Sequence, residues 1–447
     1  MNIAIQQKKM VSVSKLLMKK YKHRSGSLNY FNIMVPGTPG SLYLKFRIFG
    51  FKYFFKFLYS YLKYMFSIGL HSEYEIVKSE KNKKEYKNII ITWAYKEDFN
   101  KNGTYNDRYF KINSKKYRET LWFLIYMSVE KPKKFDENLI ILFKKKRLFN
   151  FNILRFATYF FKILFNKTNS LKDFLLKISS FSSFSEIVLD SFLKNIKTEK
   201  LKKILIPYEG QPFQKEIIKV LRKKNKKLKV IGYDHTSPPP LPLNLHYDFL
   251  SPDVLLVNGS NQLGFYSRYL KWPRKKLKLV PSSRFQDEQK RNFTNQVFLP
   301  YEILNQKIVL NEFSFLIKEG EIKKATDLTI KNHPNTSDSA THLKLIYELK
   351  KLFNENHETN NPKKFFKSSA FFVGQTTAII LALELGLTSY HVCFEPTFDS
   401  YNSKLWRNIK VKQLSEYTFK YELVKKNAFT IIKKEKNIFK KYYDFKI

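Results

Sequence analysis

The chain of 447 residues has little cysteine, glycine or acid. Its single cysteine, Cys393, excludes an intramolecular disulfide framework, and its 13 glycines exclude a collagen-like repeat. Asp and Glu number 38 against 82 Lys and Arg, which leaves a formal net charge of +44. Hydrophobic residues at 43% and aromatics at 17% exclude a disordered chain. A chain of this length and composition predicts two globular domains.

The positive charge first suggests nucleic acid. Lys outnumbers Arg several-fold, however, whereas readers of nucleic acid favour the planar, bidentate Arg fork. The sequence also lacks zinc-finger spacing, a basic leucine zipper and an aromatic RNA-binding motif. Two other interpretations stay open, a solvated surface set by compositional bias and attraction to an anionic membrane or polyanionic glycan. Nucleic acid is not an expected partner.

Residues 46–70 read FRIFGFKYFFKFLYSYLKYMFSIGL and are rich in aromatics. The cations Arg47, Lys52, Lys56 and Lys63 interrupt the segment, whereas a membrane-spanning helix needs roughly 20 nearly uncharged residues. The pattern favours either a helix lying in the membrane interface or a helix packed on its own domain. The N-terminus lacks the order of a signal peptide. We therefore expect a cytoplasmic chain, peripheral at the inner face of the cytoplasmic membrane.

Short apolar segments alternate with helix-like segments along most of the chain, a pattern typical of a parallel sheet with crossover helices. In the first half the predicted strands are 88–95, 139–143, 203–207, 228–232, 253–257 and 277–280, and the predicted helices are 151–197, 213–224 and 261–270. In the second half the predicted strands are 307–310, 327–330, 370–373 and 389–394, and the predicted helices are 341–354 and 377–385.

The predicted fold class is α/β, with two Rossmann-like domains, a cleft between them and a basic helical N-terminal extension. The polar stretch 284–306 is the expected hinge. We assign 1–75 to the basic aromatic segment, 76–290 to an acceptor domain and 291–447 to a nucleotide-sugar donor domain. Ligands in such folds bind at the carboxyl ends of the strands, so the residues that follow each strand are the candidates for chemistry.

Glu209, Gly210 and Gln211 follow the predicted strand 203–207. A carboxylate in this place could act as a general base that takes a proton from an acceptor hydroxyl. Alternatively, Glu209 could be the acidic residue that precedes a helix, where the helix dipole favours negative charge. Both roles stay open at this stage.

Asp234 and His235 follow the next strand, 228–232. Asp234 is the second candidate for the base, and His235 has a side chain that is easily tuned near neutral pH. Ser283 and Arg284 end the first half and are possible supporting residues, with Arg284 able to contact an anion.

The second half offers two groups of candidates for binding a phosphate. Lys331 and His333 lie two residues apart after the strand 327–330, on the same side of an extended segment, and Pro334 would fix the backbone after them. Gly374 allows close approach of a ligand, and Thr376 and Thr377 precede a helix whose free N–H groups suit an anion. These groups are Lys331, His333 and Pro334, and then Gly374, Thr376 and Thr377.

In this order the pattern resembles bacterial surface-carbohydrate and capsule glycosyltransferases of the GT-B type, related to CMP-sugar-dependent sialyl- and Kdo-transferases. The resemblance rests on Glu209-Gly210, His333-Pro334 and Thr376-Thr377, covers about residues 200 to 394, and extends less securely to 93–110. It implies that the acid is the base and that the His and the Thr pair hold the donor phosphate.

The sequence departs from the family pattern at two places. Tyr208 stands where a second acid is usual, and Leu381 stands where many GT-B transferases have a Glu for a ribose or sugar hydroxyl. Glu384 lies one turn further along the predicted helix.

We therefore hypothesise an inverting, metal-independent transfer of a sugar from a nucleotide-sugar onto a surface polysaccharide or lipid-linked glycan. A CMP-linked sialic-acid-like or Kdo-like sugar is the donor that the resemblance implies. No bound cofactor is expected, and no Asp-x-Asp motif or His/Cys cluster predicts a metal site. The alternatives are a non-catalytic nucleotide-sugar or polysaccharide-binding protein of the same fold, and a nucleotide-sugar epimerase.

Overall fold

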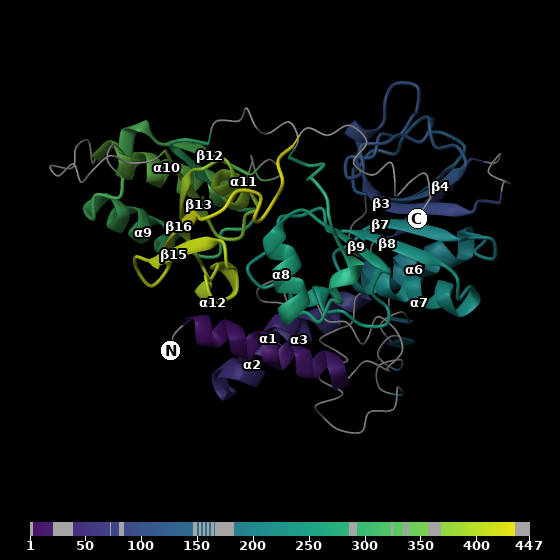
Figure 1. Ribbon diagram of the computed structural model, residues 1–447, viewed down its shortest axis with the longest axis horizontal. Coiled ribbons are helices and arrows are strands. Elements are labelled where there is room, and N and C mark those ends of the chain that lie inside the picture. Colours follow the sequence, from purple (N-terminus) through teal and green to yellow (C-terminus); the bar gives the residue numbers. More distant parts are fainter. Residues whose placement is uncertain are drawn as a thin grey trace.

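A computed structural model of the chain contains two β-sheets with helices around them (Figure 1). The structure describes residues 3–20, 39–71, 73–79, 85–145, 150–151, 153–154, 157–158, 161, 165, 183–285, 293–322, 325–333, 336, 339–355 and 368–433. The α/β class and the two separate sheets are as predicted. The division at residue 290 stays a prediction, because segments from both ends of the chain connect the two sheets.

The first sheet has eight strands in the order β10-β9-β8-β7-β3-β4-β5-β2. All neighbours are parallel except the edge strand β2, which is antiparallel to β5. The strands are β2 (Tyr74–Lys78), β3 (Asn88–Ala94), β4 (Thr120–Tyr126), β5 (Leu139–Lys144), β7 (Lys203–Pro207), β8 (Lys229–Tyr233), β9 (Val254–Val257) and β10 (Leu277–Leu279).

The six strands predicted in the first half are confirmed, but the other two strands of this sheet, β2 and β4, were missed. All seven residues of β4 are buried, so its sequence TLWFLIY shows no alternation of polar and apolar positions. A continuous apolar run of this length is the pattern of a strand covered on both faces, and this signal was present in the sequence.

The helices of this half are α6 (Ser183–Asn195), α7 (Pro212–Lys224) and α8 (Ser260–Tyr269). The last two confirm the predicted helices 213–224 and 261–270. The predicted helical region 151–197 is confirmed over α6, but its first residue belongs to β6 (Asn150–Phe151), which pairs with β1 (Leu70–His71). Most of the region between β6 and α6 lies outside the described residues.

Alternate residues of each strand divide the first sheet into two apolar faces. One set, with Ile89, Ile91 and Phe123, joins a large core that also includes residues of α1, α2, α6, α7 and α8. The other set, with Ile90 and Trp122, is covered by residues of the loop 95–119. This loop therefore takes the place of a crossover helix between β3 and β4.

The second sheet has six strands in the order β12-β11-β13-β14-β16-β15. The first four are parallel, and β16 and β15 continue the sheet antiparallel. Its elements are β11 (Gln296–Phe298), α9 (Gln306–Lys318), β12 (Thr329–Lys331), α10 (Ala340–Glu355), β13 (Ser369–Val373), α11 (Ala378–Glu384), β14 (Thr388–Val392), α12 (Pro396–Asp399), β15 (Ile409–Gln413) and β16 (Thr418–Leu423).

Two predictions for the second half were wrong. Residues 307–310 belong to α9 rather than to a strand, because their apolar run continues with Phe313, Leu316 and Ile317 at helical spacing. The side chain of Asn305 begins this helix by accepting hydrogen bonds from two backbone N–H groups. The expected hinge 284–306 contains strand β11, which lies inside the second sheet. The other predicted strands and helices of this half are confirmed within a few residues.

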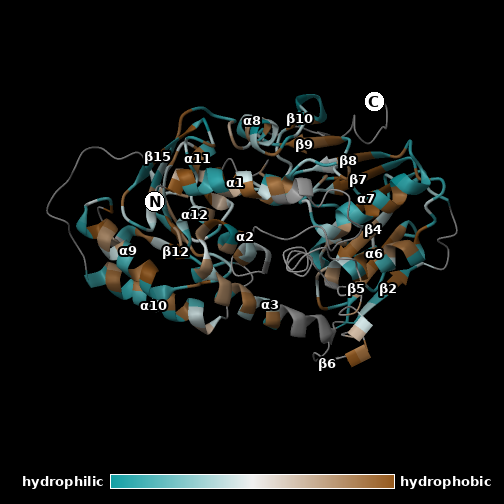
Figure 2. Cartoon of the chain, turned by 90° about the horizontal axis from the view of Figure 1, so that it is seen from below, coloured by the Kyte–Doolittle hydropathy of each residue, from teal (hydrophilic) through white to brown (hydrophobic). Residues whose placement is uncertain are grey.

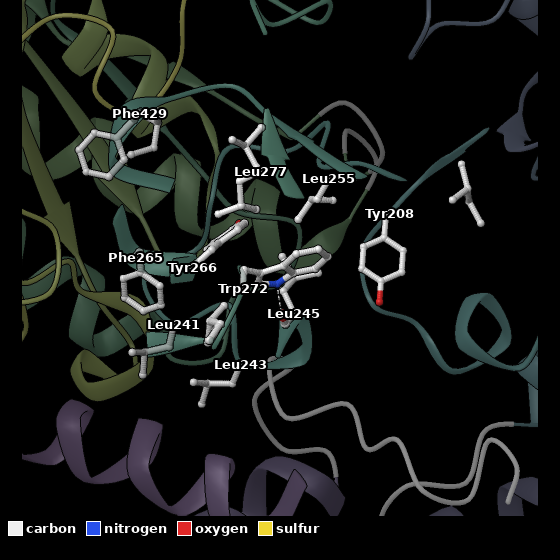
Figure 3. Packing of buried hydrophobic residues seen from close by; sticks show 14 of the residues in the cluster. Tyr208, Leu241, Leu243, Leu245, Leu255, Phe265, Tyr266, Trp272, Leu277 and Phe429 are labelled. Atoms are coloured by element: carbon white, nitrogen blue, oxygen red, sulfur yellow. Dashed lines mark hydrogen bonds between the residues drawn. The ribbon is translucent and has the colours of Figure 1, made fainter. Parts of the chain in front are cut away.

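We call the part of the chain built around the first sheet the first unit and the part built around the second sheet the second unit. The large apolar core of the first sheet continues into the second unit. Trp272 lies within this core, and its indole N–H donates to the Leu245 carbonyl at 2.7 Å (Figure 3). Phe265 of α8 stacks on Trp406, with 4.4 Å between ring centroids. The indole N–H of Trp406 in turn donates to the carbonyl of Pro240 at 2.9 Å. The two sheets therefore share one apolar core.

The segment 424–433 returns from the second sheet to the first unit. Asn261 N–H donates to the Ala428 carbonyl at 2.7 Å, and Ile431 N–H donates to the Asn258 carbonyl at 2.8 Å. Gly259 is required at this crossing, because a Cβ there would lie 2.3 Å from the Phe429 backbone. We call residues 424–433 the C-terminal strap.

The N-terminal helices α1 (Ile3–Lys20), α2 (Pro39–Phe49) and α3 (Phe54–Gly69) lie beneath both units in Figure 1, and Figure 2 looks onto them from below. Helix α1 touches both units. Gln7 donates to the Ser400 carbonyl of the second unit at 2.7 Å, and Ser14 lies 2.8 Å from His246 Nε2 of the first. Among the described helices, none has the length and apolar character needed to cross a bilayer.

Glu384 holds the C-terminal strap to α11. Its carboxylate accepts hydrogen bonds from the backbone N–H groups of Asn427 at 2.6 Å, Phe429 at 2.7 Å and Thr430 at 3.1 Å. The Glu384→Gln substitution replaces one acceptor oxygen with an NH₂ group that faces these donors. We expect it to lower the free energy of unfolding by roughly 2–4 kcal/mol, since hydrogen bonds to a charged group are lost.

Urea unfolding measures this loss, and hydrogen exchange should show faster exchange at residues 427–430. The matched control is Glu319→Gln, because Glu319 is exposed at the end of α9. Equal stability of the two variants would contradict the role given to Glu384.

Candidate functional site

The order of the first sheet reverses between β3 and β7. From β3 the chain winds outward through β4 and β5, and from β7 it winds the other way through β8, β9 and β10. In an open parallel sheet, ligands bind at the carboxyl ends of the strands at such a reversal point. Glu209 follows β7 at this point, and Trp93 lies at the end of β3. The topology therefore selects this edge of the sheet as the candidate site.

Glu209 is positioned by the turn that leads into α7. Gln211 occupies the N-cap position of α7, and its amide donates to Glu209 Oε2 at 2.7 Å. Gly210 has a left-handed backbone with φ of 67°, and a Cβ there would lie 2.4 Å from the Asn244 carbonyl oxygen. The Asn244 side chain also donates to the Glu209 carbonyl. Glu209 is therefore not the N-cap residue of α7, although it still precedes this helix, where the helix dipole favours negative charge.

Burial raises the pKa of Glu209, although the hydrogen bond from Gln211 opposes this rise. About 30% of its side chain remains exposed, so the carboxylate is reachable from solvent. A partly exposed carboxylate with a raised pKa has the properties of a general base.

His235 lies beside Glu209, with 3.4 Å between His235 Nε2 and Glu209 Oε1. Burial lowers the pKa of His235 to about 3, and the charge of Arg284 acts in the same direction. The imidazole is therefore neutral at pH 7. Its Nδ1 is buried and has no hydrogen-bond partner within the described part of the chain.

Two aromatic residues that sequence reasoning did not select complete this group. The Tyr109 ring meets the His235 ring edge-on with 4.4 Å between centroids, and the Trp93 ring lies 6.2 Å from that of Tyr109. Both side chains are partly exposed. The only sequence signal was the looser resemblance over 93–110, which contains both of them. Glu209, His235, Tyr109 and Trp93 together are called the carboxylate–aromatic site below.

The buried carboxylate of Asp107 positions Tyr109. It accepts hydrogen bonds from the backbone N–H groups of Tyr109 at 2.8 Å and Phe110 at 2.7 Å, and from the Tyr105 hydroxyl at 3.0 Å. Burial raises the pKa of Asp107 to about 6. The loop 95–119 is thus fixed from beneath, at the point where it contributes Tyr109.

Asp234 does not share this position with Glu209. It is 1% exposed, and its carboxylate accepts hydrogen bonds from Thr236 at 3.2 Å, from Gln262 at 3.0 Å and from the Tyr266 hydroxyl. An acceptor hydroxyl has no access to a carboxylate that is surrounded in this way. The geometry therefore favours Glu209 over Asp234 as the base, and Asp234 joins β8 to α8.

Ser283 and Arg284, the possible supporting residues, lie in different surroundings. The Ser283 hydroxyl lies 3.1 Å from the Tyr233 hydroxyl and donates to the Tyr109 carbonyl, so Ser283 is a buried support of the loop 95–119. Arg284 is exposed, and its guanidinium lies over the Phe285 ring. Its positive charge contributes to lowering the pKa of His235.

The predicted phosphate-binding residues of the second unit follow its neighbouring strands β12 and β13. Lys331 ends β12 and is exposed, and His333 is half-buried. Burial lowers the pKa of His333. The Tyr301 ring, which follows β11, meets the His333 ring edge-on at 5.5 Å between centroids. Tyr301 was missed because the sequence predicted a hinge there. Pro334 lies outside the described residues.

Gly374, Thr376 and Thr377 form the turn after β13. Gly374 has φ of 58°, and a Cβ there would lie 2.8 Å from the Phe394 ring. Thr377 is the N-cap residue of α11, but its side chain makes no capping hydrogen bond, whereas Thr376 accepts from the Ala378 N–H at 3.3 Å. The Thr377 hydroxyl is thus not used in starting the helix.

The structure also explains the departure at Leu381. Leu381 is buried in the shared core, and Glu384 is occupied by the C-terminal strap. Both side chains are therefore engaged within the fold, Leu381 by the apolar core and Glu384 by the backbone of the strap. Within the described ranges, no group of three or more His, Cys, Asp and Glu side chains is placed to hold a metal ion.

Comparison with known proteins adds little to this geometry. No family model matches the chain, and no curated protein matches it. Among solved structures, it is similar to an α,α-trehalose-6-phosphate synthase from Burkholderia multivorans, at 9% identity and a TM-score of 0.32. The match covers 65% of this chain and 76% of the other. A likeness of this size does not transfer an activity, so the function rests on the site itself.

The buried carboxyl of Asp234 predicts a pH-dependent stability. Burial raises its pKa from 3.8 to about 7 in the folded chain. The folded state then holds a proton that the unfolded state releases, so this stabilisation is complete below the unfolded pKa and is lost as the pH rises through about 7. An Asn at this position cannot show the loss.

We expect the stability of the native chain relative to Asp234→Asn to fall between pH 4 and 7, by at most about 1.4 kcal/mol per pH unit. Urea unfolding at several pH values measures it. The control is Asp190→Asn, since Asp190 is exposed on α6. Parallel pH profiles for the native chain and Asp234→Asn would rule out the raised pKa.

Proposed function

We propose that the chain is a glycosyltransferase of the GT-B type, in which Glu209 is the general base. The observation that carries the proposal is the position of Glu209 at the reversal point of the first sheet, with a raised pKa and a neutral His235 at 3.4 Å. Tyr109 and Trp93 add partly exposed rings of the kind on which the apolar faces of a sugar pack. The carboxylate–aromatic site therefore suits a carbohydrate acceptor with a reactive hydroxyl.

The reaction follows from these positions. Glu209 takes the proton of the acceptor hydroxyl, and the oxygen attacks the anomeric carbon of the donor sugar. The bond from that carbon to the nucleotide phosphate breaks, and the nucleotide leaves with the electron pair. Attack from the face opposite the leaving group inverts the anomeric centre. Neutral His235 lies against Glu209 without competing as a charged partner.

The leaving phosphate needs donors and positive charge. In the second unit, Lys331, His333 and the turn of Gly374, Thr376 and Thr377 follow β12 and β13 and are the groups we assign to it. Support for this assignment comes from the exposed ammonium of Lys331 and the side chain of Thr377, which makes no capping hydrogen bond. Tyr301 beside His333 is an additional ring for a nucleotide base or sugar.

The donor and acceptor classes follow the sequence resemblance. We propose a nucleotide-sugar donor, in the first place a CMP-linked acidic sugar, and a surface polysaccharide or lipid-linked glycan as acceptor. The test is transfer by the full chain with CMP-, UDP- and GDP-sugars and acceptors of both kinds. Binding of the donor without transfer or hydrolysis would instead support a non-catalytic binding protein, and interconversion of free nucleotide-sugars would support an epimerase.

Glu209→Gln keeps the size of the side chain and removes the base. We expect it to lower kcat by about 10²- to 10⁴-fold with little change in the Kd of the donor. In the native chain kcat/KM should fall as the pH drops through the pKa of Glu209, which burial places above 4.5. The control is Glu319→Gln, and transfer by Glu209→Gln at the native rate would eliminate the base role.

Lys331→Ala and His333→Ala test the phosphate role separately. Because a charged hydrogen bond contributes about 1.5–3 kcal/mol, we expect each variant to weaken nucleotide binding by about 10- to 100-fold. Calorimetry with the nucleoside monophosphate and diphosphate measures the change. Lys344→Ala is the matched control, since Lys344 is exposed on α10 of the same unit. Unchanged nucleotide affinity in both test variants would remove these residues from the donor site.

A further inference from the structure

Helix α3 and the turn before it expose a stripe of large apolar side chains. Phe55 is 65% exposed, Tyr59 71% and Leu62 49%, and their spacing of four and then three residues places them on one face of the helix. Phe51, in the preceding turn, is 66% exposed; its ring stacks on that of Phe54 and meets that of Phe55 edge-on. The stripe therefore continues beyond the start of α3.

The opposite face of α3 is already packed. Phe57 is fully buried, and its ring lies 5.5 Å from that of Tyr43 and 6.4 Å from that of Phe46, both on α2. Helix α2 is joined to the second unit through the ion pair of Lys45 and Glu395. The exposed stripe is thus held outward by a face that is fixed to the rest of the molecule.

The charged residues of α3 and of the turn before it are all basic. Lys52, Lys56 and Lys63 are exposed, and on the helix they follow the apolar positions along one flank. The first 72 residues of the chain contain twelve Lys and Arg and no Asp or Glu. No acidic side chain from this part of the sequence can therefore neutralise the lysines.

We propose that this surface docks on a bilayer that contains anionic lipid. We call it the α3 face, and it consists of Phe51, Lys52, Phe55, Lys56, Tyr59, Leu62 and Lys63. Aromatic and aliphatic side chains enter the boundary between headgroups and acyl chains, and lysines beside them bind lipid phosphates. Docked in this way, α3 would lie in the plane of the membrane surface.

The charge decides between this occupant and another protein. A partner protein or a second copy of this chain would need an acidic rim to match the lysines, and a second copy would present the same basic α3 face. An anionic bilayer supplies negative charge everywhere around the stripe. This proposal does not depend on the proposed glycosyl transfer.

The first test is co-sedimentation of the full chain with vesicles of equal parts phosphatidylglycerol and phosphatidylcholine, and with phosphatidylcholine alone. We expect binding to the anionic vesicles and a large loss of binding at high salt. The apolar variant Phe55→Ser/Tyr59→Ser/Leu62→Ser should lower the partition coefficient by about tenfold or more. The control Leu343→Ser/Tyr347→Ser alters an exposed pair on α10 and should bind as the native chain does.

The second test reverses charge without touching the apolar stripe. Lys52→Glu/Lys56→Glu/Lys63→Glu should weaken binding to anionic vesicles by about a hundredfold or more. The matched control Lys307→Glu/Lys344→Glu/Lys350→Glu makes the same charge change at exposed sites of the second unit. Thermal unfolding checks that each variant is folded.

Three results would overturn the proposal. One is failure of the native chain to bind the anionic vesicles. Another is an equal loss of binding in the control variants and in the α3 variants, which would indicate a diffuse charge effect. The third is a dimer in solution that dissociates on the Phe55→Ser/Tyr59→Ser/Leu62→Ser substitution, which would make the α3 face an interface between copies of this chain.

Discussion

Trp406 joins the two halves of the molecule. Its ring stacks on Phe265 of α8, its indole N–H donates to the Pro240 carbonyl, and Tyr401 nearby donates to the Pro238 carbonyl at 2.7 Å. The proline-rich segment that follows β8 is therefore held by aromatic residues of the second unit. Because this segment also carries His235 at its start, the contact between the units and the position of the candidate site depend on the same few residues.

The C-terminal strap and helix α1 reinforce this contact from two sides. The strap is bound by Glu384 where it returns to the first unit. Helix α1 contacts the second unit through Gln7 and the first unit through Ser14. Burying polar groups is costly unless each finds a partner, and here each partner lies on a distant segment of the chain. These contacts join the first and second sheets to each other, and the carboxylate–aromatic site and the α3 face belong to the same joined structure.

The carboxylate–aromatic site shows how neighbouring acidic residues acquire different roles. Glu209 and Asp234 each follow a buried strand, and the sequence alone left Glu209 as the first and Asp234 as the second candidate for the base. Asp234 is surrounded by hydrogen-bond donors from α8, whereas Glu209 keeps a partly exposed carboxylate beside a neutral His235. Burial raises the pKa of both, so accessibility distinguishes them rather than acidity.

The sequence by itself determined the α/β class, most strands and helices, and the polar residues that follow each strand. These are local properties, since apolar runs and their spacing depend on neighbouring residues. The tertiary structure decided the strand order, which places Glu209 at a reversal point, and the packing that brings Tyr109 against His235 across 126 positions of chain. Contacts between distant segments depend on which faces pack together, and no local pattern records that choice.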